Sequence, residues 1–510
     1  MPKKRFLFLL VAAVLTVAFC LPLLVACNDK GAEIAGKDVE RPSDIFTDDI
    51  DTVDSENLAA SASVTTASET ETSPNLIDGD EDTAWTAANA TGEYIILSFG
   101  KEVTFNTVVL RENGNYITGF RFQLPDGNGG WQESFYRQDR MERYRYCASD
   151  TVTADSIRIV IDGVNTGKQI SVAEVEVYNV AQKTYEDEFR VFAYYNVNDY
   201  KSPALDKDQL TAQLDVVTDI ILFEYVYWDQ NGDLTFTQED KNAEDYDPAS
   251  TAYLESVIAF IKECNPDVRI CLDILPGDKA AHGLPGCTEN LVANIAALAR
   301  KLDIDGVEFD WEYPTNTAEW VAYGDMMLAL KEEIGGEGRY VSVALSNFNV
   351  GFTAEQIAGI DYVQIMGYDR FDVDGNNSSF RSGAYLPMRY FINLGFKPSQ
   401  LVAGMPAYGR PDNETVGEIW TNYNYGEVWA DSAKTQQFTK WDNVQYLEYD
   451  GQLMKVFVTG GAMAYDKTAY AIEQDFAGVM VFRNLIDYPV EDDRSVIGAI
   501  GDAIADRIAQ

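Results

Sequence analysis

Histidine is almost absent from this chain of 510 residues, since His282 is the only one. A zinc site with several histidine ligands is therefore excluded, and a Ser-His-Asp triad has no motif to support it. Basic residues are also scarce, with 39 Lys and Arg against 82 Asp and Glu, which gives a formal net charge of -43. A surface with this charge repels nucleic acid and anionic lipid head groups, so we expect neutral or cationic partners.

Cysteine is rare as well, and the six cysteines show no CxxC spacing of a redox or metal site. Four of them lie beyond the N-terminal segment, namely Cys147, Cys264, Cys271 and Cys287. We expect these four to be buried as small apolar residues. One disulfide among them can form, and the sequence does not assign its partners.

A long uncharged run follows the basic residues Lys3 to Arg5 and extends to Cys27. It is long enough to span a bilayer, so an uncleaved anchor is one interpretation. The stretch "LVAC", which ends at Cys27, resembles instead the bacterial lipoprotein cleavage box, in which the cysteine is lipidated. We therefore predict a signal peptide over residues 1–26, lipidation of Cys27, and export to the outer face of a bacterial cell membrane.

Two further segments differ in composition. Residues 27–54 are acidic and contain few aromatic side chains, which is typical of a flexible spacer. Residues 55–180 consist of short alternating stretches such as "EYIILSF", "TFNTVVL" and "SIRIVI", which are separated by turn residues. This pattern predicts an antiparallel β-sandwich of ordinary domain size over 55–180.

Near the start of the sandwich, "NLIDGDEDTAW" packs Asp78, Asp80 and Thr83 into a turn, which in isolation is typical of a solvated loop. Together with "SVAEVEVY" near the end, it resembles the discoidin-like fold of coagulation factor type C domains and carbohydrate-binding module family 32. The resemblance covers the whole segment and implies carbohydrate binding and a structural calcium ion, which hard oxygen ligands suit. The ligands that it implies are Asp78, Asp80, Thr83 and Glu174, with the backbone carbonyls of Asn75 and Ala173.

From residue 188 to residue 508, strand-like stretches alternate with helix-like runs. The eight candidate strands are "FRVFAYY", "DIILFEYVY", "VRICLDIL", "DGVEFDW", "RYVSVALSN", "DYVQIMGY", "LVAGMPAY" and "FAGVMVF". Runs such as "AYLESVIAFIKEC" carry apolar residues at three- and four-residue spacing. Eight strands with βα connections predict a (β/α)8 TIM barrel. The alternative is an open doubly wound sheet, but no glycine-rich phosphate loop follows the first strand.

The fourth candidate strand carries a row of acidic residues, since "DGVEFDWEY" places Glu308, Asp310 and Glu312 at every second position. Side chains of a strand alternate between its two faces, so these three share one face. In a barrel one face packs on helices and the other lines the interior, which turns the acidic row inward. The apolar set on the helix side is Val307, Phe309 and Trp311.

Three carboxylates in a barrel interior cost far more free energy than a fold would accept for stability alone. Like charges at close range also raise at least one of the pKa values, as a general acid needs near neutral pH. We therefore interpret Glu308, Asp310 and Glu312 as catalytic residues.

The same residues carry a resemblance, since "DGVEFDWEYP" resembles the DxxDxDxE signature of glycoside hydrolase family 18, the chitinase and endo-β-N-acetylglucosaminidase family. The stretches "VFAYYNVND", "QIMGYD" and "GMPAYGR" resemble the first, sixth and seventh strands of that family, in the correct order. The resemblance implies that Glu312 is the acid/base, that Asp310 orients the substrate acetamido group, and that Glu308 holds Asp310. Tyr368 is then expected to hydrogen-bond the acetamido oxygen. The implied substrate-binding residues are Tyr194 on the barrel floor, Met366, Asp369, Tyr408, Phe482 and Trp311.

Three positions depart from the family pattern. Glu308 stands where the family has aspartate, which keeps the charge and shifts its reach. Asp273 stands at the serine position of a Ser-x-Gly-Gly motif, and Phe482 stands where a tryptophan is usual. A smaller aromatic side chain still stacks on a sugar but offers less area.

These patterns predict a surface-anchored hydrolase of β-1,4-linked N-acetylglucosamine glycans that uses a retaining, substrate-assisted mechanism. We expect no cofactor in the barrel, no nucleic acid partner and a monomer. Two alternatives stay open: an endo-β-N-acetylglucosaminidase acting on N-glycans, and a non-catalytic adhesin that binds chitin or related glycans. The presence of Glu312 favours an enzyme over an adhesin.

Overall fold

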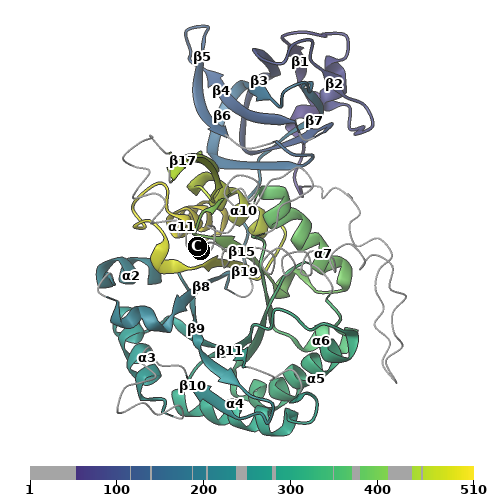
Figure 1. Cartoon of the computed structure of the whole chain (residues 1–510). Coiled ribbons are helices and arrows are strands. Elements are labelled where there is room, and N and C mark those ends of the chain that lie inside the picture. The colour runs from purple at the N-terminus through teal and green to yellow at the C-terminus, as the bar shows by residue number, and fades with distance from the viewer. Residues whose placement is uncertain are drawn as a thin grey trace, which may run out of the picture.

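A computed structural model describes most of the chain after residue 52 (Figure 1). The described ranges are 53–114, 116–137, 141–185, 188–202, 205–236, 250–277, 283–347, 350–369, 379–411, 439–449 and 452–509. The predicted signal peptide, Cys27 and nearly all of the predicted spacer lie outside these ranges, and so does His282.

The N-terminal part is an antiparallel β-sandwich, as the alternating stretches predicted. Its sheet has the strand order β2-β7-β3-β6-β4-β5, and β1 pairs with β3. Side chains at alternate positions, such as Ile95 and Leu97, enter a core that also contains Trp85, Phe120 and Phe122. The strands are β1 (Ser63–Thr66), β2 (Trp85–Thr86), β3 (Glu93–Glu112), β4 (Ile117–Pro125), β5 (Trp131–Arg137), β6 (Arg145–Val164) and β7 (Ser171–Tyr178), with short 3-10 helices η3 (Leu58–Ser61) and η4 (Ser73–Ile77).

The C-terminal part is a closed barrel of eight parallel strands, which confirms the predicted fold. The strands follow the order β9-β11-β12-β13-β14-β15-β19-β8, and the pairing of β8 with β9 closes the ring. The strands are β8 (Arg190–Asn196), β9 (Asp219–Trp228), β11 (Arg269–Pro276), β12 (Gly306–Phe309), β13 (Tyr340–Leu345), β14 (Tyr362–Ile365), β15 (Leu401–Pro406) and β19 (Gly478–Phe482).

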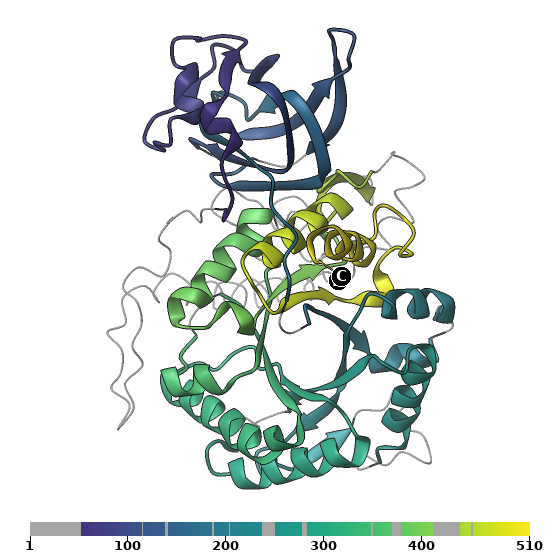
Figure 2. The ribbon, with the colours of Figure 1, turned by 180° about the vertical axis from the view of Figure 1, so that it is seen from behind.

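Helices ring the barrel strands, as Figure 2 shows from behind. Polar caps fix several helix starts: Asn316 accepts a hydrogen bond from the backbone of Glu319, and Thr353 forms a capping box with Gln356. The helices are α2 (Lys207–Leu214), α3 (Ala252–Cys264), α4 (Thr288–Leu302), α5 (Thr317–Ile334), α6 (Ala354–Gly359), α7 (Leu386–Leu394), α10 (Gly461–Glu473) and α11 (Val496–Arg507). Shorter elements are η5 (Val197–Lys201), η7 (Gly335–Glu337), the π-helix η8 (Arg381–Tyr385), η9 (Pro398–Gln400), η11 (Asn484–Ile486), β10 (Leu234–Phe236), β16 (Arg410–Pro411), β17 (Val444–Tyr449) and β18 (Gln452–Phe457).

The sandwich packs directly on the barrel beside α10 (Figures 1 and 2). Asp466 of α10 accepts hydrogen bonds from Arg137 of β5 at 3.1 Å and from Arg145 of β6 at 2.7 Å. All three side chains are at most 1% exposed. Around them, aromatic rings of the two domains meet in one continuous hydrophobic cluster, as in the stacking of Tyr144 on Tyr385 with ring centroids 4.7 Å apart.

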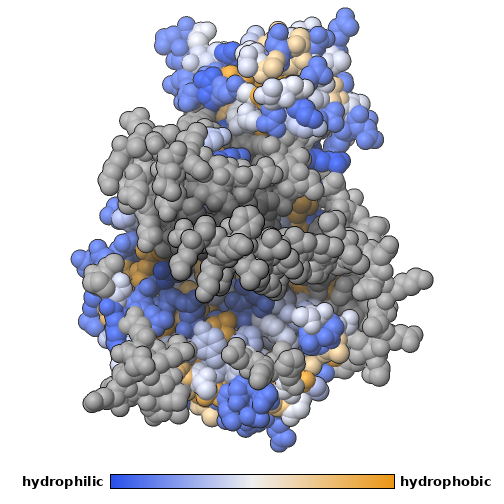
Figure 3. Space-filling view, in the orientation of Figure 1, coloured by the Kyte–Doolittle hydropathy of each residue, from blue (hydrophilic) through white to orange (hydrophobic). Residues whose placement is uncertain are grey.

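Where the surface is coloured in Figure 3, it is largely hydrophilic, and hydrophobic groups occur there in small patches. In the described part of the chain, Tyr446 stands out as an exposed large hydrophobic side chain, at 45% exposure. No helix within the described ranges is long and apolar enough to cross a membrane. Cys147, Cys264, Cys271 and Cys287 are all free thiols.

Candidate active site

The acidic row begins on β12, a short strand whose two faces are both buried. Val307 and Phe309 are fully buried on the helix side, where the ring of Phe309 meets Tyr323 of α5 with centroids 6.2 Å apart. Glu308 points the other way and is also fully buried. Asp310 and Glu312 follow beyond the end of the strand and line a cavity of about 760 Å³. The period-two pattern thus distributes the side chains between the two faces as the sequence predicted.

Glu308 is held from below by two hydroxyl groups. The hydroxyl of Tyr194 on β8 donates to Oε1, and the hydroxyl of Ser342 on β13 donates to Oε2 at 3.2 Å. Gln364 of β14 supports this arrangement, because its Nε2 donates to the Ser342 hydroxyl at 3.2 Å. Burial raises the pKa of Glu308, while the bonds from Tyr194 and Ser342 act in the opposite direction.

Asp310 and Glu312 differ in their surroundings. Burial raises the pKa of Asp310, and the nearby charge of Glu312 raises it further. Oδ1 of Asp310 has no hydrogen-bond partner among the described residues, so it is available to a bound molecule. Glu312 reaches solvent, yet partial burial raises its pKa, a hydrogen bond with Tyr313 lowers it, and the charge of Asp369 raises it. Glu312 therefore stays protonated up to a higher pH than an ordinary glutamate does.

Aromatic side chains form the opposite wall of the cavity. The ring of Tyr368 meets Tyr408 and Phe482, with centroids 6.1 Å apart in each pair. Phe482 also lies 5.3 Å from the ring of Tyr194. The predicted residues that line the cavity are Tyr194, Asp310, Glu312, Met366, Tyr368, Asp369, Tyr408 and Phe482.

Trp311 is the exception among the predicted substrate-binding residues. It is 8% exposed and packs between Trp228 and Tyr323, with ring centroids 6.5 Å and 5.2 Å away. The lining of the cavity does not include it. The physical reason is the alternation of the segment, which turns Trp311 to the helix side together with Phe309. The expectation that Trp311 contacts sugar is therefore wrong in this structure.

Sequence reasoning missed three residues of the site. Arg410 of β16 donates from Nε to Oδ1 of Asp369 at 2.7 Å and neutralises part of its charge. Glu224 and Tyr227 of β9 line the cavity beside Asp273. A signal was present for Glu224, because it is the single charged residue inside the apolar stretch "IILFEYVYW".

The predicted calcium ligands lie in the turn after η4 and on β7. Glu174 accepts hydrogen bonds from the backbone N–H groups of Gly79 and Asp80 at 2.7 and 3.1 Å. Thr83 donates to Oδ2 of Asp78 at 2.9 Å. Burial raises the pKa of Glu174 to about 8, and its contact with Asp78 contributes. Asn75 lies on η4 and Ala173 on β7 beside Glu174.

Two carboxyl groups that meet in this way suit a hard cation. Asp80, however, directs Oδ1 to the backbone N–H of Asp82 at 3.0 Å. Among the described residues, no group of three or more Asp, Glu, Cys or His side chains is arranged to hold a metal ion. The calcium site therefore stays a prediction.

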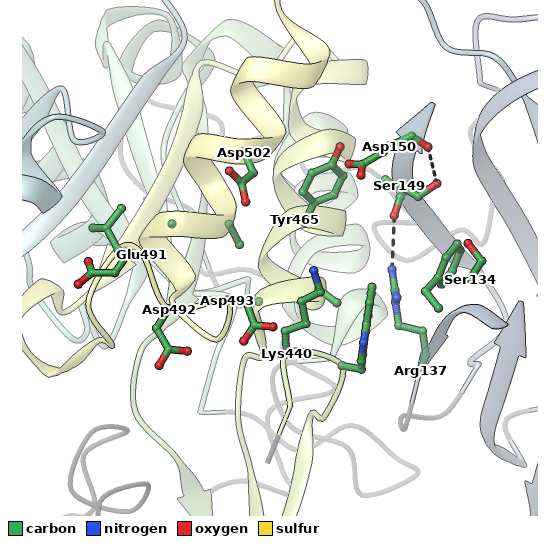
Figure 4. Close-up of a pocket in the computed structure, with 18 of the residues that line it drawn as sticks. Ser134, Arg137, Ser149, Asp150, Lys440, Tyr465, Glu491, Asp492, Asp493 and Asp502 are labelled. Atoms are coloured by element: carbon green, nitrogen blue, oxygen red, sulfur yellow. Dashed lines mark hydrogen bonds between the residues drawn. The ribbon is translucent and has the colours of Figure 1, made fainter. Parts of the chain in front are cut away.

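A second cavity, of about 480 Å³, lies between the sandwich and the barrel. In Figure 4, Ser134, Arg137 and Ser149 of the sandwich face it from one side, and Asp502 and Glu491 lie on the other side. It contains none of the acidic row, so the candidate chemistry belongs to the cavity at β12.

The fold and the site define a two-domain protein: a β-sandwich docked on a (β/α)8 barrel with an acidic, aromatic-walled cavity. The family model for glycosyl hydrolases family 18 matches residues 190–485. The model for the F5/8 type C domain matches residues 58–175. The first match covers more than half of the chain, and the chain therefore belongs to glycosyl hydrolases family 18, with an F5/8 type C domain preceding the barrel.

Several chitinases are similar to parts of this chain. Class V chitinase CHIT5b of Medicago truncatula is 28% identical over 151 residues, which are 25% of this chain and 40% of that protein. A class V chitinase of Arabidopsis thaliana is 24% identical over 272 residues, or 46% of this chain and 66% of that protein. Matches to three relatives from Medicago truncatula and Drosophila melanogaster span only 36–40% of their lengths.

Among solved structures, the Ostrinia furnacalis Group IV chitinase in complex with allosamidin aligns with a TM-score of 0.51 and 17% identity. The alignment covers 63% of this chain and all of that chain. At this identity the likeness shows the fold alone, and that fold is the barrel.

Proposed function

We propose that this protein is a chitinase-like glycosidase that cleaves β-1,4-linked N-acetylglucosamine glycans. The observation that carries the proposal is the position of Glu312 at the open side of a cavity that also presents Asp310 and Tyr368. The chitinase names of the family 18 relatives support the same substrate class. The raised pKa of a carboxyl group at the mouth of such a cavity favours an enzyme over a pure binding protein.

The residues support a substrate-assisted, retaining reaction. Glu312, when protonated, donates its proton to the glycosidic oxygen as the bond to the leaving sugar breaks. The carbonyl oxygen of the 2-acetamido group attacks the anomeric carbon and closes an oxazolinium ring, and Asp310 stabilises the positive charge. Water then opens the ring as Glu312 takes up a proton, and the configuration at the anomeric carbon is retained.

The supporting residues have separate tasks in this proposal. Tyr368 donates a hydrogen bond to the acetamido oxygen, and the phenyl ring of Phe482 lies under the reacting sugar. Tyr194 and Ser342 fix Glu308, which in turn limits the positions that Asp310 can take. The positive charge of the oxazolinium ion lowers the pKa of Asp310, so Asp310 is ionised while that intermediate exists.

A test of the proposal compares Glu312→Gln with the wild type on chitin tetramer. The glutamine keeps the shape but donates no acidic proton, so turnover should fall by about 10² to 10⁴-fold while tetramer binding persists. Cellulose tetramer should not be cut by the wild type, because it lacks the internal nucleophile. Glu332→Gln removes an exposed carboxylate on α5 and serves as the matched control, with turnover unchanged.

Two results would reject the proposal: full activity of Glu312→Gln on chitin tetramer, or efficient cleavage of cellulose tetramer by the wild type. A wild type that binds acetamido glycans without cleaving them would establish the adhesin alternative. Cleavage of a high-mannose glycoprotein, with chitin tetramer left intact, would establish the endo-β-N-acetylglucosaminidase alternative.

We further propose that the sandwich binds glycan and that a lipid on Cys27 tethers the protein to the outer face of a bacterial membrane. The F5/8 type C match supports the first part, since the family resemblance implies a carbohydrate-binding module. The "LVAC" stretch supports the second. A second sugar-binding module would raise the effective concentration of substrate near the barrel.

A further inference from the structure

An irregularity in the barrel sheet lies beside the acidic row. The ladder between β9 and β11 shifts its register between Leu272 and Ile274, so three residues of β9 stand opposite Asp273 alone. Glu224 is the middle residue of these three. A bulge of this kind turns side chains away from the regular alternation, and bulges are frequent next to active sites.

The backbone at Glu224 has an uncommon conformation. Its φ is +61°, in the left-handed region that side chains other than glycine, asparagine and aspartate rarely adopt. As a result Glu224 is exposed in the cavity, while its neighbours Phe223 and Tyr225 are buried. Strained positions of this kind persist where the surrounding structure enforces them, and they cluster at sites that bind or react.

Asp273 gives a second, independent sign of a ligand. Its side chain is 1% exposed, it lines the same cavity, and its Oδ1 has no hydrogen-bond partner among the described residues. A buried carboxyl oxygen without a donor is costly, so a donor from a bound molecule is expected. Tyr227 lines the same cavity, and its pKa is raised by burial and by the charges of Glu224 and Asp273.

The charges of the side chains that line the cavity indicate which kind of hydrogen-bond donor a bound molecule would bring. The described lining contains five carboxyl groups and no Lys, Arg or His. Asp369 is paired with Arg410, and Asp310 and Glu312 are assigned to the acetamido sugar. Among the described residues, Glu224 receives a neutral donor, the side-chain amide of Asn196. Among the described residues, the pair formed by Glu224 and Asp273 therefore has no positive partner in the lining of the cavity.

We propose that Glu224 and Asp273 form a subsite for the ammonium group of a glucosamine unit, next to the acetylated sugar that Glu312 cleaves. The inference rests on the proposed function and specifies its substrate class as partly deacetylated chitin. An ammonium group offers three donors and a positive charge to the two carboxyl groups that line this part of the cavity. An acetamido group offers one neutral donor, and a hydroxyl group carries no positive charge that would favour an ionised carboxyl group.

Binding to the catalytically impaired variant Glu312→Gln tests the subsite without relying on turnover. The probes are chitin tetramer and the set of tetramers that carry one glucosamine unit each, titrated by calorimetry at low salt. At least one glucosamine isomer should bind about fivefold more tightly than the fully acetylated tetramer. Adding Glu224→Gln should reduce this preference to nearly one, and so should 0.5 M salt, which screens the pair.

Two further variants make the result unambiguous. Glu224→Asn removes the charge with a residue that adopts the left-handed conformation readily, so it covers the case in which the glutamine variant folds poorly. Glu332→Gln, on the outer helix α5, removes an equal charge elsewhere and should leave the preference intact. A preference that survives both Glu224 variants, or no preference at all, overturns the subsite.

The outcome is distinguishable from a failure of the proposed function. If the wild type cleaves chitin tetramer while no glucosamine isomer is preferred, the glycosidase proposal stands and the subsite is wrong. If the wild type cleaves nothing but a Glu224-dependent preference is measured, the subsite stands without the catalytic proposal. Sequencing of products from partly deacetylated chitin adds a check, since glucosamine should be enriched at one fixed distance from the cleaved bond.

Discussion

At the scale of single residues, the state of one proton governs the candidate reaction. Burial raises the pKa of Glu312, and Asp369 adds to this through its negative charge. Asp369 is held in the left-handed region at φ +62° and is bound by Arg410. Its carboxylate is thus held at a position from which its negative charge raises the pKa of Glu312.

Replacing Asp369 with asparagine should move the pH profile of activity. A general acid works only when protonated, so activity is lost as the pH rises through its pKa. Asp369→Asn removes a negative charge, which stabilises the ionised form of Glu312 and lowers its pKa. The loss of the ion pair with Arg410 acts in the same direction. The alkaline limb of kcat/KM on chitin tetramer should move to lower pH by about half a pH unit.

Asp303 provides the matched control for this experiment. It also lies in the left-handed region, at φ +50°, and it pairs with Arg339 at 3.4 Å, far from the cavity at the end of α4. Asp303→Asn should leave both limbs of the profile in place. If Asp369→Asn lowers kcat/KM by the same factor at every pH, Asp369 contacts the substrate without setting the pKa of Glu312.

At the scale of elements, the sequence predicts regular features well and irregular ones poorly. The alternation in "DGVEFDWEY" predicted the faces of β12, because a period of two depends only on local geometry. The bulge at Glu224 could not be predicted, since it is a property of the pairing between β9 and β11 and not of either strand alone. Arg410 escaped notice for a similar reason: its partner Asp369 is 41 residues away.

The turn after η4 and strand β7 carry the calcium prediction. A cation between Asp78 and Glu174 would relieve the repulsion of two close carboxyl groups and bind the native state only. Millimolar calcium should therefore raise the melting temperature of the whole protein relative to chelator. At about 100 times Kd the gain is about 2.7 kcal/mol. Glu174→Gln should abolish the calcium-dependent shift.

Glu81 lies in the same turn and provides the control. It is outside the predicted ligand set and pairs with Arg111 at 3.4 Å. Glu81→Gln should keep the calcium-dependent shift, although it removes an equal charge from the same loop. Identical melting curves of the wild type in calcium and in chelator would remove the calcium site.

At the scale of the whole molecule, the two domains are joined by a buried ionic contact. Asp466 accepts hydrogen bonds from both Arg137 and Arg145, and it also accepts one from the backbone N–H of Ala148 at 2.8 Å. The guanidinium of Arg137 lies 5.1 Å from the ring centroid of Trp441, which stacks near Phe135. The sequence could not predict this contact, because its partners are more than 300 residues apart and each segment alone has an ordinary pattern.

Asp466→Asn should therefore weaken the docking of the sandwich on the barrel. The asparagine removes the negative charge that Asp466 presents to two buried guanidinium groups, and breaking a buried ion pair of this kind costs about 3–5 kcal/mol. Calorimetry should show a lower melting temperature and a split of the unfolding transition, as the sandwich unfolds before the barrel. The control is Asp162→Asn, which breaks an ion pair with Arg121 at 2.9 Å. The side chains of Arg121 and Asp162 are 34% and 41% exposed. An exposed pair contributes at most about 1 kcal/mol, so this variant should melt almost as the wild type does. A single transition of Asp466→Asn at the wild-type temperature would show that aromatic packing alone joins the domains.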